Sequence, residues 1–506
     1  MRRFIQLFGQ LLQPTARRFH AALEQPQRAQ QRVQQAICDR LVASDYGQSL
    51  GIRSIADWQR LPVVTYEDLE PWIERAGLTP EPILFYEKTS GSAGAVKRIP
   101  YTRSLRRSFN QMFCVWAQDL IQNGPAFETG QLYACISPNL GLTSSQAGPA
   151  TLQDDSEYLD RWLRWLLRPF LVMPSGLKQV SHPDEFKYRL ALALVQAERL
   201  ETISVWSPSF LQVQLAYIQA HQQELIQALN LRADRRQLLS QPAIPWTQLW
   251  PHLKLISCWD SVHAADQAAS LRLQFPAVLV QGKGLLATEA PITIPLIAAG
   301  GYVPVLDQVF LEFEDGSGHL HRLEDLRSGD SYNLILSQKG GLYRYRLGDQ
   351  VRVTHWYRQT PCLEFCGRGQ GESDLVGEKL HPDFVRQVLQ TLPLGQASFK
   401  SLVPIAHPPH YGLLLDRAKS PGAIAVALEQ GLSESYHYRR ARMLGQLAPP
   451  IVLVANQMPE LLAMARTSRG RVWGGIKYGL LQGTAIDPEL LDQIRQVAIR
   501  GTIQQP

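Results

Sequence analysis

Residues 82–102, PILFYEKTSGSAGAVKRIPYT, carry the local pattern that organises this chain of 506 residues. The apolar run at 83–86 predicts a short strand, and a loop of glycine, serine and threonine follows it as far as Lys97. Residues 102–123 then have apolar side chains at helical spacing, and Gly124 can end that helix. We therefore expect the order strand, glycine-rich loop, helix.

The loop TSGSAGAVK at 89–97 has the composition of an anion-binding loop. Small residues let backbone N–H groups approach an anion closely, hydroxyl groups can donate to phosphate oxygens, and Lys97 brings positive charge. The P-loop pattern GxxxxGK[ST] of nucleotide hydrolases is absent. On local grounds a flexible turn and a phosphate site both remain open.

The flanking sequence predicts an α/β architecture with a largely parallel sheet. The first ninety residues have mostly helical patterns, and short apolar strands are predicted at 131–137, 201–207 and 253–259 with helical segments between them. From 305 to 366 the pattern changes to strands separated by Gly or Asp turns. The polar, glycine-rich stretch around Gln370 has the composition of a hinge, so we expect a large N-terminal domain at 1–370 and a small α+β domain at 371–506.

Composition indicates a globular, cytoplasmic protein. The formal net charge of +6 is small for this length and is not gathered in one block, so nothing indicates nucleic-acid binding. The six cysteines show no CxxC pair, which favours reduced thiols. Glutamines interrupt the apolar N-terminal run, so an amphipathic helix is expected there rather than an export signal. The apolar stretch at 290–306 contains prolines and a Gly pair, so no membrane span is expected.

Three later motifs contain residues suited to nucleotide chemistry. In LLATEAP, Glu289 can hold Mg²⁺ while the hydroxyl of Thr288 contacts a phosphate, although a strand end or helix cap also explains the pair. In GGLYRYRLGDQVRV, Asp349 follows a strand and a Gly turn, where a carboxylate can accept both hydroxyls of a ribose or simply serve a β-turn. In CGRGQGESDLVGEKL, Arg368 lies on a Gly-flanked turn.

The order of these motifs resembles the adenylate-forming superfamily, which includes acyl-CoA synthetases and firefly luciferase. A narrower resemblance spans roughly residues 61–480 and rests on VVTYEDLEPWIER, the loop with KRIP, GLYRYRLGD, GRGQGESDLVGEKL and RGRVWGGIKYGLL. These stretches look like the acyl-acid amido synthetases first known as plant auxin-responsive proteins. That resemblance implies activation of a small carboxylic acid by ATP and Mg²⁺ to an acyl-adenylate, followed by transfer to an amino acid or another amine.

The resemblance also implies a role for each motif. Lys97 would lie near the leaving pyrophosphate, Thr288 would contact the α-phosphate and Glu289 would help hold Mg²⁺. Asp349 would bind the ribose hydroxyls, and Arg368 would support the nucleotide at the domain junction. The implied phosphate cradle consists of Thr89, Ser90, Gly91, Ser92 and Gly94.

The C-terminal domain of such enzymes supplies a lysine to the α-phosphate, and Lys477 in GGIKYGLL is the candidate, with Arg471 in RTSRGRV as its rival. Two positions depart from the family pattern: Leu285 stands where an aromatic residue usually lies against adenine, and Gln370 stands where a hinge aspartate is usual. These departures motivate one alternative, a catalytically impaired member that binds small carboxylates. Transfer of the acyl group to a thiol (coenzyme A or a carrier protein) is a separate alternative.

Overall fold

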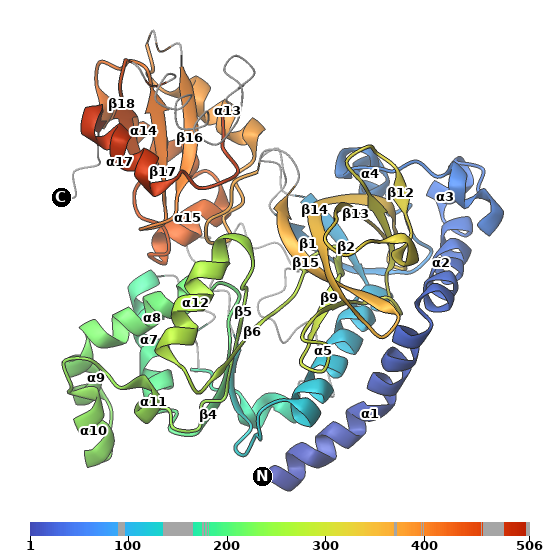
Figure 1. Ribbon diagram of the computed structural model, residues 1–506, viewed down its shortest axis with the longest axis horizontal. Helices are drawn as coiled ribbons and strands as arrows, with labels where there is room; N and C mark the ends of the chain where they lie inside the picture. Colours follow the sequence, from blue (N-terminus) through green and yellow to red (C-terminus); the bar gives the residue numbers. More distant parts are fainter. Residues whose placement is uncertain are drawn as a thin grey trace. The chain divides into compact units, whose positions relative to one another are not determined.

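The computed structural model describes residues 1–89, 97–134, 165–174, 177, 180, 182–368, 372–395, 397, 399–456, 458 and 480–501 (Figure 1). The chain divides into two compact units, of which unit 1 contains residues 1–89 and 97–367 and unit 2 contains residues from 368 onward. Each unit has its own hydrophobic core. Among the described helices, none is both long and apolar enough to cross a membrane. The five cysteines in the described parts of the chain are free thiols.

Helices form the N-terminal part of unit 1, as predicted. They are α1 (Arg2–Glu24), α2 (Pro26–Val42), α3 (Asp45–Ser49), the 3-10 helix η1 (Ile55–Arg60) and α4 (Tyr66–Glu74). A proline at position 26 starts α2, where its missing N–H costs nothing, and thereby separates α2 from α1. A capping box fixes the start of α4, because the Asp68 carboxylate accepts from the backbone N–H of Thr65 at 2.8 Å.

A hairpin and a long helix occupy the stretch that opened the sequence analysis. Strand β1 (Ile83–Thr89) pairs antiparallel with β2 (Lys97–Thr102), and Thr89 lies opposite Lys97. The Thr102 hydroxyl then accepts from the N–H of Leu105 and caps α5 (Arg103–Asn123). The predicted β1 and α5 are confirmed, but the predicted order missed β2. Residues 90–96 therefore join the two strands of a hairpin rather than a strand and a helix.

A four-stranded parallel sheet forms the second part of unit 1. The strands, in spatial order, are β3 (Gln131–Ala134), β4 (Leu200–Ser204), β5 (Leu255–Cys258) and β6 (Leu279–Gly282). The accompanying helices are α7 (Pro183–Gln196), α8 (Pro208–Ala220), α9 (Gln222–Ala228), α10 (Ala233–Leu239), α11 (Trp246–Leu249) and α12 (Ala265–Gln274). The predicted α/β pattern with a parallel sheet is confirmed, because short apolar strands alternate with amphipathic helices.

An antiparallel sheet and two short hairpins complete unit 1. The sheet has the order β12 (Leu320–His321), β11 (Phe310–Glu314), β13 (Ser331–Gln338), β14 (Leu342–Tyr357) and β15 (Thr360–Arg368). The hairpins pair β7 (Leu286–Ala287) with β8 (Ala290–Pro291), and β9 (Thr293–Leu296) with β10 (Gly301–Pro304). The β-rich texture predicted from residue 305 is confirmed.

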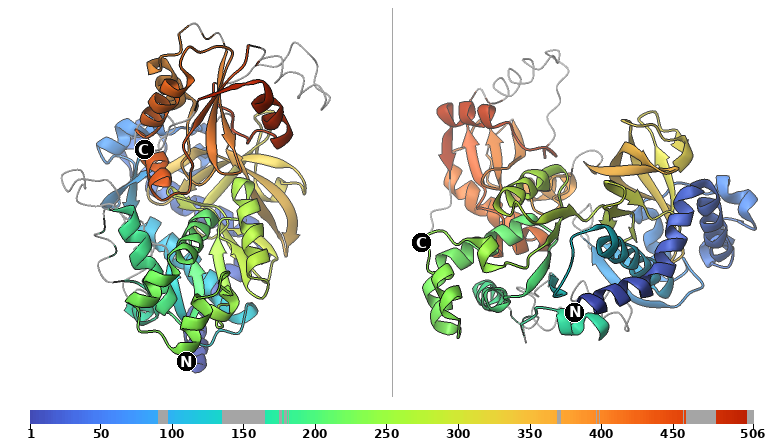
Figure 2. Two further views of the ribbon diagram at one scale, coloured as in Figure 1. Left: turned by 90° about the vertical axis from the view of Figure 1, so that its left-hand side faces the viewer. Right: turned by 60° about the horizontal axis from the view of Figure 1, so that its bottom comes forward.

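One hydrophobic core connects the N-terminal helices, the β1–β2 hairpin, the β7–β8 region and the antiparallel sheet. Its buried members include Tyr66 from α4, Tyr101 from β2, Leu285 beside β7, and Tyr345 and Leu347 from β14. Figures 1 and 2 show α5 running alongside α1 within this unit. Segments that are hundreds of residues apart in sequence therefore share one rigid support.

Unit 2 is a small α/β sandwich. Its sheet has the order β16 (Lys400–Ile405), β17 (His410–Leu415), β18 (Ile451–Val454) and β19 (Ile499–Gly501). Apolar side chains of α13 (Pro382–Thr391), α14 (Pro421–Leu432) and α15 (Tyr436–Met443) form a core with one set of strand residues. Helix α17 (Pro488–Val497) packs against the alternate strand residues, so helices cover both faces of the sheet.

A buried carboxyl group makes the stability of unit 2 depend on pH. Glu378 is fully buried and accepts hydrogen bonds from the N–H groups of Leu375 and Val376, at 2.7 and 2.8 Å, and from the Tyr411 hydroxyl. Burial, helped by the Asp374 charge, raises the pKa of Glu378 from its ordinary value of 4.5 to about 8. Between these two values the folded state binds more protons than the unfolded state. The contribution of Glu378 to stability is therefore present below pH 4.5 and is lost as the pH rises to 8.

Replacing this carboxyl group with an amide should remove that pH dependence. One titrating proton changes the free energy of unfolding by about 1.4 kcal/mol per pH unit, so wild type should lose about that much more than Glu378→Gln between pH 6 and pH 7. Urea unfolding of the whole protein at pH 6 and at pH 7 measures this difference in the free energy of unfolding. Glu434→Gln, at an exposed turn position, is the control and should keep the wild-type dependence. Equal pH slopes in wild type and Glu378→Gln would refute the assignment.

Candidate active site

Tyr66 supports the C-terminal side of the glycine-rich loop. Its hydroxyl accepts a hydrogen bond from the backbone N–H of Arg98 at 2.9 Å, and the Lys97 ammonium lies 5.5 Å from the centroid of the Tyr66 ring. A cation over an aromatic face at this distance is attracted by the ring quadrupole. Lys97 is thus the first residue of a paired strand and rests on a buried ring, which restricts where its charge can lie.

Thr288 and Glu289 form the two-residue turn of the β7–β8 hairpin, in which Ala287 pairs with Ala290. Turn residues usually face solvent, yet Glu289 is only 8% exposed. Glu289 therefore points into the protein. Buried carboxylates are costly unless they are paired or bind a cation, so their positions often mark functional sites.

Tyr101 connects this turn to the glycine-rich hairpin. The hydroxyl of Tyr101, a buried residue of β2, donates to the backbone carbonyl of Thr288 at 2.8 Å. The two motifs are 187 residues apart in the sequence, so this contact is a tertiary one. The structure therefore brings Lys97, on β2, and Thr288 to neighbouring elements of one core.

Removing that hydroxyl should loosen the connection. We expect Tyr101→Phe to lower the free energy of unfolding by about 1 kcal/mol, because the Thr288 carbonyl loses its buried partner. If this chain forms the acyl-adenylate that the sequence resemblance implies, and if all of that energy is lost in the transition state, the rate of that step falls about fivefold. Urea unfolding and pyrophosphate exchange measure the two effects. Tyr332→Phe, in the same hydrophobic core but away from both motifs, is the control, and an equal loss of rate in that variant would contradict this role of Tyr101.

Asp349 lies within strand β14 and not after it. In the pairing of β13 with β14, Asn333 lies opposite Gln350 and Ile335 lies opposite Arg346. One residue of β13, Leu334, therefore faces three residues of β14, Leu347, Gly348 and Asp349. This is a bulge, and Gly348 adopts a positive φ of 87° within it. The β-turn interpretation of Asp349 is therefore wrong. Bulges often re-aim a side chain beside an active site, and Asp349 is only 2% exposed.

Val64 links the Asp349 strand to the glycine-rich hairpin. Its N–H donates to the carbonyl of Arg344 at 3.0 Å, and its carbonyl accepts from the N–H of Arg346 at 2.8 Å. Val64 precedes Tyr66 by two residues, and Tyr66 supports Lys97 and Arg98. The same segment thus contacts β14 and β2, so Asp349 and the glycine-rich loop are positioned by one connected set of elements.

Several predicted site residues fall where the structure gives little or no detail. Ser90, Gly91, Ser92, Gly94, Gln370, Arg471 and Lys477 lie outside the described residues. Thr89 and Arg368 are the last residues of β1 and β15, and nothing is described of their side chains. Leu285 is buried in the core, and its N–H donates to the Thr293 hydroxyl at 2.7 Å. An aliphatic side chain therefore occupies the position that the resemblance assigns to an aromatic ring.

Sequence reasoning missed a polar cluster at the carboxyl edge of the parallel sheet, the edge where ligands bind in open α/β sheets. Asp260 follows β5 and accepts from the Tyr302 hydroxyl and from Arg272, the latter at 3.1 Å. Burial, followed by the Asp260 charge, raises the pKa of Tyr302. A Cβ atom at Gly282, the last residue of β6, would collide with both Tyr302 and Asp260. The only sign of this cluster in the sequence was Gly282, in the stretch GKG at 282–284.

A second feature of that edge is aromatic. The rings of Trp206, after β4, and Trp259, after β5, have centroids 5.8 Å apart. Lys283 lies with its ammonium 5.1 Å from the Trp206 ring and donates to the Ser204 hydroxyl at 2.7 Å. The edge thus combines aromatic surface with the Lys283 ammonium. Among the described residues no group of three or more His, Cys, Asp or Glu could enclose a metal ion.

Solved structures with the same fold include amido synthetases and a coenzyme A ligase. The acyl acid amido synthetase AtGH3.15 in complex with 2,4-DB is 17% identical, with a TM-score of 0.63 and 98% of each chain covered. A 2-hydroxyisobutyryl-CoA ligase is 16% identical, with a TM-score of 0.53 and 95% of this chain and 92% of that chain covered. At these identities the likeness shows the fold alone, and it confirms the predicted fold class.

Among curated relatives, a probable indole-3-acetic acid-amido synthetase of Oryza sativa subsp. japonica is 24% identical over 282 residues, which cover 50% of this chain and 53% of that protein. An indole-3-acetic acid-amido synthetase of Arabidopsis thaliana is 23% identical over 381 residues, which cover 61% and 63%. The chain thus spans between about half and two thirds of the length of these two relatives.

Family domains match more than half of the chain. Residues 15–244 match the GH3 family N-terminal domain, and residues 302–368 match the GH3 family central domain. The first match contains the glycine-rich hairpin and the second contains Asp349. The chain therefore belongs to the GH3 family.

Proposed function

We propose that this protein is an ATP- and Mg²⁺-dependent acyl-acid amido synthetase. In this proposal a small carboxylic acid reacts with ATP to give an acyl-adenylate and pyrophosphate, and the amine of an amino acid then displaces AMP to form an amide. Family membership supports the proposal, and so do the names of the relatives, which are amido synthetases for indole-3-acetic acid. We propose further that residues 1–370 form the adenylation domain and that residues 371–506 form a mobile lid in the cytoplasmic enzyme.

The observation that carries the proposal is the contact between Tyr101 and Thr288. It joins the hairpin of the glycine-rich loop to the turn that holds Glu289, although a long stretch of sequence separates them. Adenylation needs these groups together, because a carboxylate and the α-phosphate of ATP carry like charges and repel each other. Positive charge and hydrogen-bond donors that are fixed in advance must offset this repulsion.

The residues of the proposed site divide this work between them. Lys97 neutralises charge on the departing pyrophosphate, and the Thr288 hydroxyl donates to the α-phosphate. Glu289 would supply one carboxylate to Mg²⁺, which takes one or two carboxylates together with phosphates and water. The bound metal would offset phosphate charge. Asp349 accepts the two ribose hydroxyls, and Arg368 supports the nucleotide.

The remaining parts of the proposed site are assigned on more general grounds. We propose Thr89, Ser90, Gly91, Ser92 and Gly94 as the phosphate cradle. The carboxyl edge of the parallel sheet, with Trp206, Trp259 and Lys283, is our proposed surface for the acyl group, since apolar walls with a few polar groups are typical of such sites. From the C-terminal domain we propose Lys477 as the cation for the α-phosphate, with Arg471 as the alternative.

The fold alone leaves the acceptor open, because a coenzyme A ligase has the same architecture. An acceptor screen tests the proposal: purified protein receives ATP, Mg²⁺ and a panel of carboxylic acids, with each amino acid or with coenzyme A, and the products are identified by mass. We expect an acyl-amino acid amide. A thioester with no amide would favour the thiol alternative. No condensed product with any acid and acceptor would favour an impaired member, a possibility that Leu285 at the adenine position motivates.

A further inference from the structure

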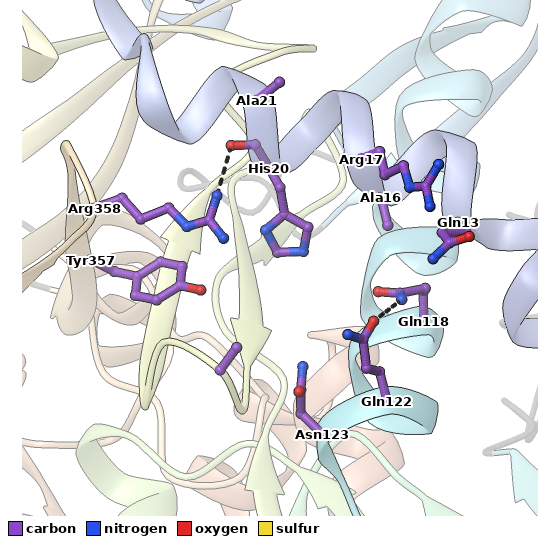
Figure 3. Close-up of a pocket in the computed structure, with 11 residues that line it drawn as sticks. Gln13, Ala16, Arg17, His20, Ala21, Gln118, Gln122, Asn123, Tyr357 and Arg358 are labelled. Carbon is purple, nitrogen blue, oxygen red and sulfur yellow. Dashed lines mark hydrogen bonds between the residues drawn. The ribbon is translucent and has the colours of Figure 1, made fainter.

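A cavity of about 510 Å³ lies in unit 1 between α1, α5 and the end of β14 (Figure 3). Figure 3 shows the His20 imidazole and the Tyr357 phenol directed toward the same space from opposite elements, with the Gln118 and Asn123 amides on the α5 side. None of its lining residues belongs to the nucleotide motifs. Its volume is within the range of small-molecule sites in proteins.

The lining of this cavity is polar and includes two arginine side chains. Arg17 on α1 and Arg358 after β14 contribute guanidinium groups, and the described wall contains no Asp or Glu. Two carboxylates, Glu24 and Asp119, act electrostatically on His20 in this wall. Glu24 pairs with Arg358 at 2.9 Å and so offsets one of the two guanidinium charges. Asp119 accepts from the backbone N–H of Ile297 at 2.6 Å and from the Asn123 amide at 2.8 Å. The positive charge of Arg17 is therefore the main charge that the wall presents to a ligand.

His20 adds a polar atom that the described protein does not satisfy. Its Nδ1 is buried and has no hydrogen-bond partner among the described residues. Since this atom has almost no accessible surface, it is shielded from the cavity as well as from solvent. Burial and then the Arg358 charge lower the pKa of His20, partly offset by Asp119 and Glu24, so the ring is neutral near pH 7. A neutral imidazole can donate or accept at this atom.

We propose that this cavity binds a small oxyanion, a molecule with a carboxylate or phosphate group and a compact polar body, at a site separate from the adenylation site. Arg17 would bind the anionic group, with Arg358, which Glu24 partly neutralises, beside it. The amides of Gln118 and Asn123, beyond their bonds to Gln122 and Asp119, would bind the polar body together with the Tyr357 phenol. Small side chains of three alanines in the wall leave room for the ligand.

Calorimetry on the full-length protein tests this site with succinate and inorganic phosphate as probes, at an ionic strength held constant with sodium chloride. We expect saturable binding of at least one probe at a single site. Binding of succinate alone would identify a carboxylate ligand, and binding of phosphate alone would identify a phosphate ester. Arg17→Gln should weaken binding about tenfold, because it removes a charged hydrogen-bond donor. Arg18→Gln, the neighbouring exposed arginine outside the cavity, should bind as wild type does.

The controls separate this site from the adenylation site. Lys97→Ala should leave binding in the cavity unchanged, whereas a probe held by the glycine-rich loop would be lost in that variant. Because Arg17 is exposed, its variant should fold, and an unchanged melting temperature verifies this. The proposal is overturned by the absence of saturable binding of both probes up to about 10 mM, by equal weakening in Arg17→Gln and Arg18→Gln, or by loss of binding in Lys97→Ala alone.

Discussion

Glu289→Gln should lower the rate of acid-dependent pyrophosphate exchange by a factor of about 10²–10³, with little change in stability. The substitution keeps the size and shape of the side chain and removes only its charge. In our proposal that charge helps hold Mg²⁺, and the lost stabilisation acts on the transition state in which pyrophosphate leaves. The effect should appear mainly in kcat, and a higher Mg²⁺ concentration should restore part of it.

The position of Glu289 makes this test informative. A buried carboxylate at a two-residue turn has two explanations: it binds a cation during the reaction, or it stabilises the turn through the protein alone. Glu324→Gln, at an exposed position of a 3-10 helix in the same unit, is the matched control and should retain full exchange. If Glu289→Gln exchanges pyrophosphate at the wild-type rate at every Mg²⁺ concentration, Glu289 does not bind Mg²⁺.

Asp349→Asn should raise KM for ATP by a factor of about 10–100 and leave KM for the acid unchanged. A carboxylate that accepts two ribose hydroxyls makes charged hydrogen bonds, which contribute about 1.5–3 kcal/mol, and an amide retains only part of them. The near-isosteric change preserves the β14 bulge. Steady-state exchange rates over a range of ATP concentrations measure the effect.

The alternative for Asp349 is a purely structural carboxylate, since the residue is only 2% exposed. That role predicts a lower free energy of unfolding with an unchanged KM for ATP, the reverse of what we expect. Asp330→Asn, at an exposed position just before the paired strand β13, is the control and should alter neither quantity. The ratio of the KM change to the stability change therefore distinguishes nucleotide binding from packing.

The sequence predicted those elements whose pattern is local. The apolar run at 83–86 predicted β1, the helical spacing after Thr102 predicted α5, and three short apolar runs predicted β3, β4 and β5. The residues of each segment are enough to predict it, because an element that is buried on one side has apolar residues at regular spacing.

What the sequence did not predict depends on partners that are distant in the chain. Strand β2 was missed because KRIPYT has no clear alternation and becomes a strand only by pairing with β1. A β-turn was the alternative for Asp349 because a Gly-Asp pair fits one, whereas the register with β13 places it in a bulge. Tyr66 and Tyr101 act through tertiary contacts with residues that are 32 and 187 positions away in the sequence. A single sequence gives no sign of such contacts. The sequence was enough to choose Lys97, Thr288, Glu289 and Asp349 as candidates. It did not identify the residues that hold them in place.

The most direct test of the central claim is the exchange of labelled pyrophosphate into ATP, measured with the purified protein across a panel of small carboxylic acids. Adenylation is reversible, so an acyl-adenylating enzyme exchanges label only when its acid is present. We predict acid-dependent exchange with at least one acid, lost in Lys97→Ala and Glu289→Ala and retained in Glu324→Gln. No exchange with any acid, from a protein that is folded and binds ATP, would contradict the claim that this chain forms acyl-adenylates.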